Sequence, residues 1–302
     1  MPTLAKAVYL GNQAGGTPKI NLKGIMVGNG CLGSEIGVCA FDSANEINTN
    51  MPYFAGHGLI APTTYQRVLK NCKDPSNPSA ACETDIAQAH DEVGGVNIYD
   101  IYGPCIDGPS SSGVRLDAQT GRLVHVRAPV PVREGSGGPI ACIDETIAVY
   151  IGSPAVAAAL HVIPTLHWAV CGSNSSFNYQ RTEKDERIDV YPVLIEQAKI
   201  NVLIFNGEAD ACVPWVDNEA WTRSMNYSVA TPWTAWASEG QVAGYFTGYD
   251  ATSRGGGKNF AFATVKGSGH MVPEYTPAAA WTLFSSFVNG LTVGGEKWFG
   301  RE

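Results

Sequence analysis

Three short runs of apolar residues stand out along the chain, and each is closed by a glycine. They are "INLKGIMVGNG" at residues 20–30, "INVLIFNGEAD" at 200–210 and "NFAFATVKGSG" at 259–269. A run that is apolar on both faces and ends in a turn residue is typical of a strand buried inside a parallel sheet. We therefore predict interior strands at these three positions.

Other segments repeat their apolar residues with helical spacing. "MPTLAKAVYLGNQ" (1–13) has the pattern of an amphipathic helix, and "DETIAVYIGSPAVAAALHV" (144–162) that of a helix, a turn and a second helix. After the third predicted strand, one helical stripe is formed by Ala280, Leu283, Phe284, Phe287 and Val288. Because helical segments lie between or after the predicted strands, the pattern indicates an α/β fold.

The segment from residue 31 to 165 has a different pattern. Clusters of Gly, Pro and Ser interrupt it, as in "CKDPSNPSAAC" (72–82), and residues 114–132 read as a β-hairpin with "TG" near the turn. We expect a loop-rich cap or insertion at 31–165 and a core formed by residues 1–30 and 166–302.

Composition narrows the classes of partner. The 302 residues carry a net charge of −8, and only 16% of them are charged. Nucleic acid is therefore not an expected partner, because its phosphates need a basic surface. No apolar run reaches the roughly 18 residues of a membrane span, so no membrane segment is expected.

Cysteine usage points to an oxidising compartment. The chain has 8 cysteines, and none forms a C-x-x-C pair, so disulfides are favoured over zinc or thioredoxin-type chemistry. Asn174 and Asn226 begin N-x-S triplets, which are candidate glycosylation sites and agree with a secreted or lumenal protein. The first residues lack the pattern of a signal peptide.

The histidines show no metal-ligand spacing. None of the 6 belongs to an H-E-x-x-H or similar motif. We therefore predict no metal and no cofactor. His57, in "GHGL", is expected to make a structural hydrogen bond.

Two residues at strand ends form the candidate site. Asp210 follows the second predicted strand and His270 follows the third, and side chains at the carboxyl ends of parallel strands are where open α/β sheets carry their chemistry. Taken singly, His270 could be a capping or core histidine and Asp210 a turn residue. Together they match the end of the chain order Ser…Asp…His, in which a carboxylate orients a histidine that takes a proton from a serine.

Longer stretches around these residues carry a family resemblance. "VLIFNGEADACVPW" (202–215) resembles the acid motif of the serine carboxypeptidases, and "VKGSGHMVPEYTPAAAWTLFSSFVNG" (265–290) resembles their histidine motif. "NIYDIYGPC", "QVAGYFTGY" and further stretches match as well, so that the resemblance covers nearly the whole chain. Glu208 stands where the family usually has Asp.

The resemblance implies an α/β-hydrolase fold and an enzyme that releases the C-terminal residue of a peptide through an acyl-enzyme. His270 would be the base and Asp210 the residue that orients it, while Met271 and Trp215 would line the substrate cleft. The implied location is secreted, lysosomal or vacuolar.

The resemblance also implies a disulfide pattern. Cys72–Cys82 and Cys105–Cys142 are the expected pairs, and Cys31–Cys39 is a plausible local third. Cys171 matches a cysteine that pairs with an upstream segment in relatives. Cys212 would then remain as a thiol beside the site.

The nucleophile has no counterpart in the sequence. Relatives carry it in Gly-Glu-Ser-Tyr-x-Gly, shortly before a helix that "MPTLAKAVYL" (1–10) resembles, and Gly-x-Ser-x-Gly occurs nowhere in the chain. The resemblance thus implies a partial fold that begins after the serine. Such a chain would be inactive alone and would need the missing N-terminal half, besides a peptide substrate.

Two other functions stay open. A relative that binds peptides or proteins without catalysis would keep the fold, although retention of Asp210, His270 and Met271 weighs against it. A carboxypeptidase-like acyltransferase would carry the same motifs. The sequence leaves the oligomeric state open, a homodimer included.

Overall fold

The computed structural model describes residues 1–33, 36–40, 43–103, 113–116, 123–126, 150–163 and 185–290. The described residues group into two compact units. The first comprises Met1–Val93, Ile98–Tyr102 and the described part of Glu183–Glu302, and the second comes from Gly94–Asn97 and Gly103–Thr182. The expected division into a core and a cap at residues 31 and 165 stays a prediction.

A mixed five-stranded sheet organises the first unit, in the order β1-β4-β7-β6-β5. β1 (Gly24–Gly28), β4 (Asn201–Gly207) and β7 (Phe260–Val265) run parallel to one another. These are the three strands expected from the sequence, and their interior, parallel character is confirmed for β4 and β7. β1 is hydrogen-bonded on one side only among the described residues.

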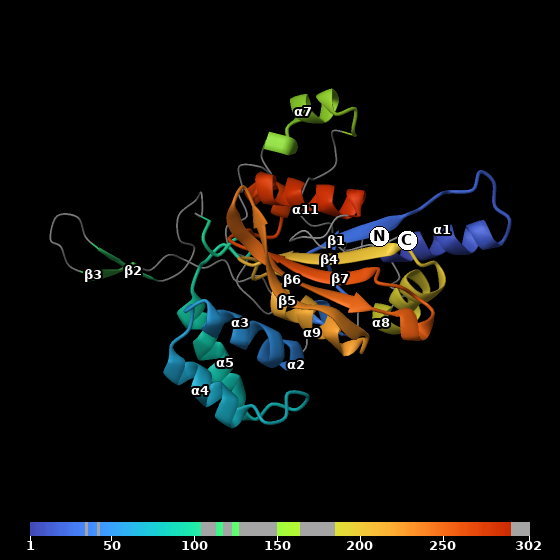
Figure 1. The fold of residues 1–302 in the computed structure, drawn as a ribbon. Coiled ribbons are helices and arrows are strands. Elements are labelled where there is room, and N and C mark those ends of the chain that lie inside the picture. Colours follow the sequence, from blue (N-terminus) through green and yellow to red (C-terminus); the bar gives the residue numbers. More distant parts are fainter. Residues whose placement is uncertain are drawn as a thin grey trace. The chain divides into compact units, whose positions relative to one another are not determined.

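Both faces of this sheet are covered, which explains the continuous apolar runs. Val202, Ile204 and Phe262 point to a core that also holds side chains of α1 (Pro2–Gln13), the π-helix η3 (Val193–Gln197) and α9 (Trp215–Ser224). Leu203 and Ala263 point to the opposite core, against α11 (Pro277–Asn289). Figure 1 shows α11 on one face of the sheet and α9 on the other.

A long hairpin extends the sheet on its other side and was not foreseen. β5 (Ser228–Ser238) and β6 (Gln241–Asp250) are antiparallel, and β6 pairs antiparallel with β7. Their turn consists of Glu239 and Gly240, with φ of 52° and 75°, as a type I′ turn requires. The sequence signal was weak because most side chains of β5 are exposed, so that no apolar alternation marks the strand.

The apolar stripe of α11 is only partly covered. Leu283 is buried, whereas Phe284 is 47% and Val288 62% exposed. A groove of about 1010 Å³ runs between this helix and β1. Its apolar side chains include Leu22, Met26, Phe205, Trp281, Phe284 and Val288.

Residues 43–93 are mostly helical, so the expectation of a loop-rich segment was wrong there. The elements are α2 (Ser43–Asn45), the π-helix η2 (Glu46–Asn50), α3 (Met51–Gly56), α4 (Pro62–Asn71) and α5 (Ala80–Val93). Within this range, the cluster that suggested a loop lies in one short connection, since Pro75 and Pro78 fall between α4 and α5. Pro52 and Pro62 stand in the first turns of α3 and α4, where proline is tolerated.

Several short elements complete the description. They are η1 (Val38–Ala40), α8 (Glu186–Asp189), η4 (Thr252–Arg254) and α10 (Val272–Tyr275) in the first unit, and β2 (Gly113–Leu116), β3 (Leu123–Val126) and α7 (Pro154–Ala159) in the second. β2 and β3 pair antiparallel, which confirms the expected hairpin. Of the expected helices at 144–162, residues 144–149 lie outside the described residues. No helix in the described ranges is long and apolar enough to cross a bilayer.

Candidate active site

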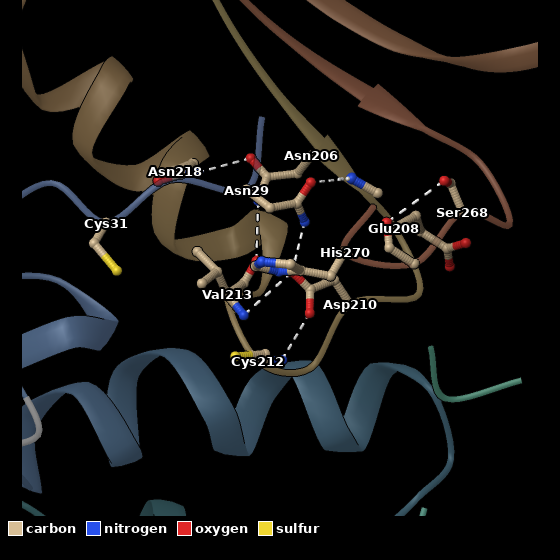
Figure 2. A network of polar contacts seen from close by, with 12 residues as sticks. Asn29, Cys31, Asn206, Glu208, Asp210, Cys212, Val213, Asn218, Ser268 and His270 are labelled. Atoms are coloured by element: carbon tan, nitrogen blue, oxygen red, sulfur yellow. Dashed lines mark hydrogen bonds and ion pairs between the residues drawn. The ribbon is translucent and has the colours of Figure 1, made fainter. Parts of the chain in front are cut away.

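Asp210 and His270 meet at one edge of the sheet. β4 and β7 are parallel neighbours, so the segments that leave their carboxyl ends lie side by side. Oδ2 of Asp210 and Nδ1 of His270 are 2.7 Å apart. The two residues that the sequence singled out separately therefore form one hydrogen-bonded pair (Figure 2).

Glycines let the two loops approach closely. The amide of Ala209 donates to the carbonyl of Ser268 at 2.8 Å, which ties the loop after β4 to the loop after β7. A Cβ on Gly207 would collide with the carbonyl oxygens of Ser268 and Gly269. Any larger residue at 207 would therefore force the loops apart.

The Asp210 carboxylate is buried and surrounded by donors. It has 0% exposure. Asn29 Nδ2 donates to Oδ2 at 2.6 Å, and the amides of Cys212 and Val213 donate to Oδ1 and Oδ2 at 2.8 and 3.3 Å. Burial raises the pKa of Asp210 above its ordinary value, and the hydrogen bonds from His270, Cys212 and Asn29 oppose that rise. Donors on both oxygens favour the ionised form that orients His270.

Asn29 belongs to the site, and the sequence interpretation missed it. It is buried directly after β1, and its Oδ1 accepts the amide of Gly207 at 3.0 Å while its Nδ2 reaches Asp210. Its φ of 44° is in the left-handed region, which asparagine tolerates better than most residues. "GNG" at the end of a predicted strand was the available signal.

The His270 ring is held from its backbone as well as from Asp210. The amide of His270 donates to the carbonyl of Tyr99 at 2.7 Å, and the centroids of the Tyr99 and His270 rings are 5.3 Å apart. With Nδ1 donating to a carboxylate, the neutral ring leaves Nε2 as an acceptor. The side chain is 29% exposed, so it is accessible to a reacting group.

Residues 98–102 buttress both loops. The carbonyl of Ile98 accepts the amides of Ala211 and Cys212 at 2.8 and 2.9 Å, and the amide of Ile101 donates to Ala209 at 3.0 Å. The sequence offered no chemical signal for these hydrogen bonds, because only backbone groups make them.

The two expected substrate-lining residues lie close to the pair in sequence. Met271 follows His270 and is 43% exposed. Trp215 begins α9, is partly buried against the core, and faces Trp233 at 6.0 Å between ring centroids. Contact of either side chain with a substrate stays a prediction.

A second histidine–acid pair lies beside the first. Nε2 of His57 is 2.9 Å from Oε1 of Glu208, and its Nδ1 is 2.8 Å from the carbonyl oxygen of Tyr53. The structural hydrogen bond expected of His57 is confirmed, although the sequence did not indicate its partner.

Disulfides join Cys31 to Cys39 and Cys72 to Cys82. Cys212 carries a thiol. Cys105, Cys142, Cys171 and Asn174 lie outside the described residues. Asn226 is described and exposed, so a glycan there is sterically compatible and stays a prediction.

One group of potential metal ligands occurs in the described part of the chain. Ligand atoms of Asp210, Cys212 and His270 lie within 4.8 Å of one another. We assign no metal to it, because the Asp210 oxygens already accept hydrogen bonds from His270 and three other donors.

Comparison with known proteins gives consistent matches. The family model described as serine carboxypeptidase matches residues 1–290. Serine carboxypeptidase-like 20 of Arabidopsis thaliana is 31% identical over 326 residues, which cover 97% of this chain and 62% of that protein. Serine carboxypeptidase 1 of Hordeum vulgare is 32% identical over 323 residues, covering 96% and 61%. The chain thus spans about three fifths of the length of these relatives.

A solved structure has the same fold. Kex1(delta)p, a prohormone-processing carboxypeptidase from Saccharomyces cerevisiae, superposes with a TM-score of 0.55 at 15% identity, over 96% of this chain and 60% of that one. The expected α/β-hydrolase fold is thereby confirmed.

Proposed function

Because the chain belongs to the serine carboxypeptidase family, we propose that it supplies the acid and the base of a Ser–His–Asp site that releases C-terminal residues from peptides. The observation that carries the proposal is the 2.7 Å contact between a fully buried Asp210 and His270. Its position at the carboxyl ends of two parallel strands matches the place of catalytic residues in this fold.

The chemistry follows from the orientation of the ring. Asp210 accepts a hydrogen bond from Nδ1–H of His270, so Nε2 can take the proton of a serine hydroxyl as the serine oxygen attacks the scissile carbonyl carbon. The imidazolium then gives this proton to the departing amine, and the acyl group stays on the serine. Water, deprotonated by the same Nε2, hydrolyses the ester.

We assign the serine to a segment outside these 302 residues. Gly-x-Ser-x-Gly does not occur in the sequence, and relatives are longer than the matched region. The edge of β1 and the apolar groove beside α11 are a surface on which such a segment would pack. A carboxypeptidase active site is thus proposed to form between the two parts.

An oxidising compartment is the proposed location. The disulfides Cys31–Cys39 and Cys72–Cys82 support it, because such bonds persist outside the reducing cytosol. Glycosylation at Asn226 would agree with it and is testable by peptide mass analysis.

The first measurement is the intact mass of the native protein, with and without reductant. A mass larger than 32.0 kDa, or a second chain released by reductant, is expected. The native species is then assayed on a blocked dipeptide and on an acyl glucose ester. Release of the C-terminal amino acid supports the carboxypeptidase, and transfer from the ester alone supports the acyltransferase.

Two variants of the native species link activity to the pair. His270→Ala and Asp210→Asn are each expected to lower kcat by about 10⁴-fold. The first removes the base, and the second removes the carboxylate that keeps the proton of the neutral His270 ring on Nδ1. Hydrolysis that persists in both variants, or a native mass of 32.0 kDa without hydrolysis, would refute the proposed function.

A further inference from the structure

Glu208 connects three parts of the site through its carboxylate. It follows β4 and precedes Asp210 by two residues. Oε1 contacts His57 Nε2 at 2.9 Å, and Oε2 accepts the amide of Gly267 at 3.0 Å. Gly267 lies three residues before His270. We call this the His57–Glu208 clamp; it joins the end of α3 to the loops that carry Asp210 and His270.

Backbone contacts strengthen the same junction. The amide of Glu208 donates to the carbonyl of Val265 at 2.9 Å. The hydroxyl of Tyr53, one turn before His57 on α3, donates to the carbonyl of Glu208 at 3.1 Å. The Tyr53 and His57 rings pack with their centroids 4.1 Å apart. Side chains of α3 thus hold the segment immediately before the catalytic acid.

Hydrogen-bond chemistry fixes the number of protons in the clamp. The carbonyl of Tyr53 can only accept, so Nδ1 of His57 carries a proton. An ionised Glu208 can also only accept, so Nε2 must carry a proton as well. The clamp is therefore complete as an imidazolium beside a carboxylate. A neutral His57 has one ring proton and loses its hydrogen bond either to Glu208 or to the Tyr53 carbonyl.

We propose that His57 and Glu208 are positioning residues that hold the loops carrying Asp210 and His270 together, and that the clamp is complete only while His57 is an imidazolium and Glu208 a carboxylate. The proposal deepens the proposed function where it concerns rate, whereas its geometric part holds for the chain itself.

Surrounding charges agree with this protonation. Burial acts to lower the pKa of His57, but hydrogen bonds to Glu208 and to the Tyr53 carbonyl outweigh it and leave the pKa raised. The hydrogen bond from His57 lowers the pKa of Glu208. The charge of Lys266, after β7, also lowers the pKa of Glu208. Two tyrosines feel the Glu208 carboxylate in turn, because after burial it contributes to the raised pKa values of Tyr53 on α3 and of Tyr102 in residues 98–102. Asp100 and Asp210 raise the pKa of Tyr53 in the same direction.

These directions set the pH window. The contribution of His57 is present below its ordinary pKa of about 6.5 and is lost as pH rises through the raised folded value. The contribution of Glu208 is present above its ordinary pKa and is lost as pH falls through the lowered folded value. The clamp is closed between the two folded pKa values.

A matched pair elsewhere in the same unit provides the control. His90 Nε2 lies 2.7 Å from Oε1 of Glu46, and its pKa is also raised by that contact. This pair joins α5 to η2 and packs against Phe54. It is likewise a contact between a histidine and a glutamate, but neither residue lies in the loops after β4 or β7.

The test is proton NMR of the 302-residue chain with ¹⁵N-labelled histidine, following the downfield Nδ1–H signal of His270. His57→Leu is expected to lose or broaden this signal under conditions where the wild type and His90→Leu keep it. An unchanged His270 signal in a folded His57→Leu chain would overturn the proposal.

Glu208→Gln gives an independent answer if His57→Leu fails to fold. A glutamine amide can donate to neutral His57 and accept from Gly267, so the link no longer needs the extra proton. As pH rises, the His270 signal of Glu208→Gln is expected to persist beyond the point at which the wild type loses it. The same pH dependence in both proteins would overturn the proposal.

Kinetics separate this inference from the proposed function. In the native, active species, His57→Leu is expected to lower kcat by about 10- to 100-fold and to change KM by less than about twofold. If the enzyme is active but His57→Leu leaves the His270 Nδ1–H signal unchanged, the clamp alone is refuted. A clamp confirmed by NMR in a protein without hydrolytic activity refutes the proposed function alone.

Discussion

At the scale of single residues, buried polar groups decide the geometry of the site. Asp210, Asn29 and Asn206 are all buried, and each has hydrogen-bond partners. Asn206 accepts from Asn218 at 2.8 Å, and Asn218 in turn accepts from Trp221 at 2.6 Å, so the network extends from the site into the core. Buried groups of this kind cost free energy when one partner is removed.

Asn29→Ala is expected to lower the free energy of unfolding by about 2–3 kcal/mol, because it leaves the amide of Gly207 buried without an acceptor. Urea unfolding measures the change. Asn12→Ala is the matched control: Asn12 also bonds one amide and one carbonyl, both of Ile20, but these two hydrogen bonds are exposed. Its cost should stay under about 1 kcal/mol. Equal effects of the two variants would contradict the account.

Asp217 gives a prediction for pH. Burial raises the pKa of this α9 residue to about 6, and its Oδ2 has no hydrogen-bond partner among the described residues. The folded pKa is above the unfolded value, so its stabilising contribution is present below about pH 4 and is lost as pH rises through about 6. Asp217→Asn is therefore expected to gain stability relative to wild type by about 2–3 kcal/mol between these limits.

Urea unfolding at several pH values measures this difference. Asp189→Asn, which changes an exposed carboxylate, is the control and should show a difference within about 0.5 kcal/mol at every pH. A stability difference between Asp217→Asn and wild type that is constant with pH would contradict the role of burial.

At the scale of elements, the site depends on strand ends that are parallel and adjacent. The alternation of Val202 and Ile204 against Leu203 places β4 between two cores, and β7 follows the same rule. Both strand ends were predictable because their apolar runs are long. The hairpin β5–β6 was not predicted because most side chains of β5 are exposed. The helices within 43–93 were not predicted because a Pro- and Ser-rich cluster was taken as typical of the whole segment.

Gly207→Ala tests the close approach of the two loops. The added methyl group meets backbone carbonyls of Ser268 and Gly269, which cannot move away as a side chain would. A loss of about 1–3 kcal/mol is expected in urea unfolding. Gly11→Ala in α1 meets no atom within 4 Å and should stabilise the protein by up to about 1 kcal/mol. Tolerance of Gly207→Ala would show that the loops are less tightly held.

At the scale of the whole molecule, the described surface includes an apolar region without a cover. The groove between α11 and β1 exposes Trp281 by 68% together with Phe284 and Val288. An open strand edge and an apolar patch of this kind favour association. The 302-residue chain alone is therefore expected to self-associate through this surface.

Phe284→Lys is expected to reduce the concentration-dependent association of the isolated chain, as measured by sedimentation velocity. Leu69→Lys on α4 is a matched control, because Leu69 has the same 47% exposure as Phe284 but lies outside the groove. The same sedimentation behaviour in both variants would rule out the groove as the associating surface.

The sequence alone determined the α/β class, the interior strands and the pair Asp210 and His270. The strands were predictable because burial on both faces of a strand requires a continuous apolar run. The pair was predictable because an acid and a histidine follow directly after two of those strands. The family resemblance also led us to expect the disulfide Cys72–Cys82, with Cys31–Cys39 as a local candidate, and the structure contains both.

Only the tertiary structure showed what holds the pair in place. Asn29 lies 181 positions from Asp210, and His57 lies 151 positions from Glu208. Residues 98–102 hold the two loops mainly through backbone hydrogen bonds, which no side-chain pattern marks. No local pattern encodes such contacts, because they arise when the sheet brings distant strand ends and α3 together. The positions of these supporting groups are therefore a property of the folded chain rather than of any segment of it.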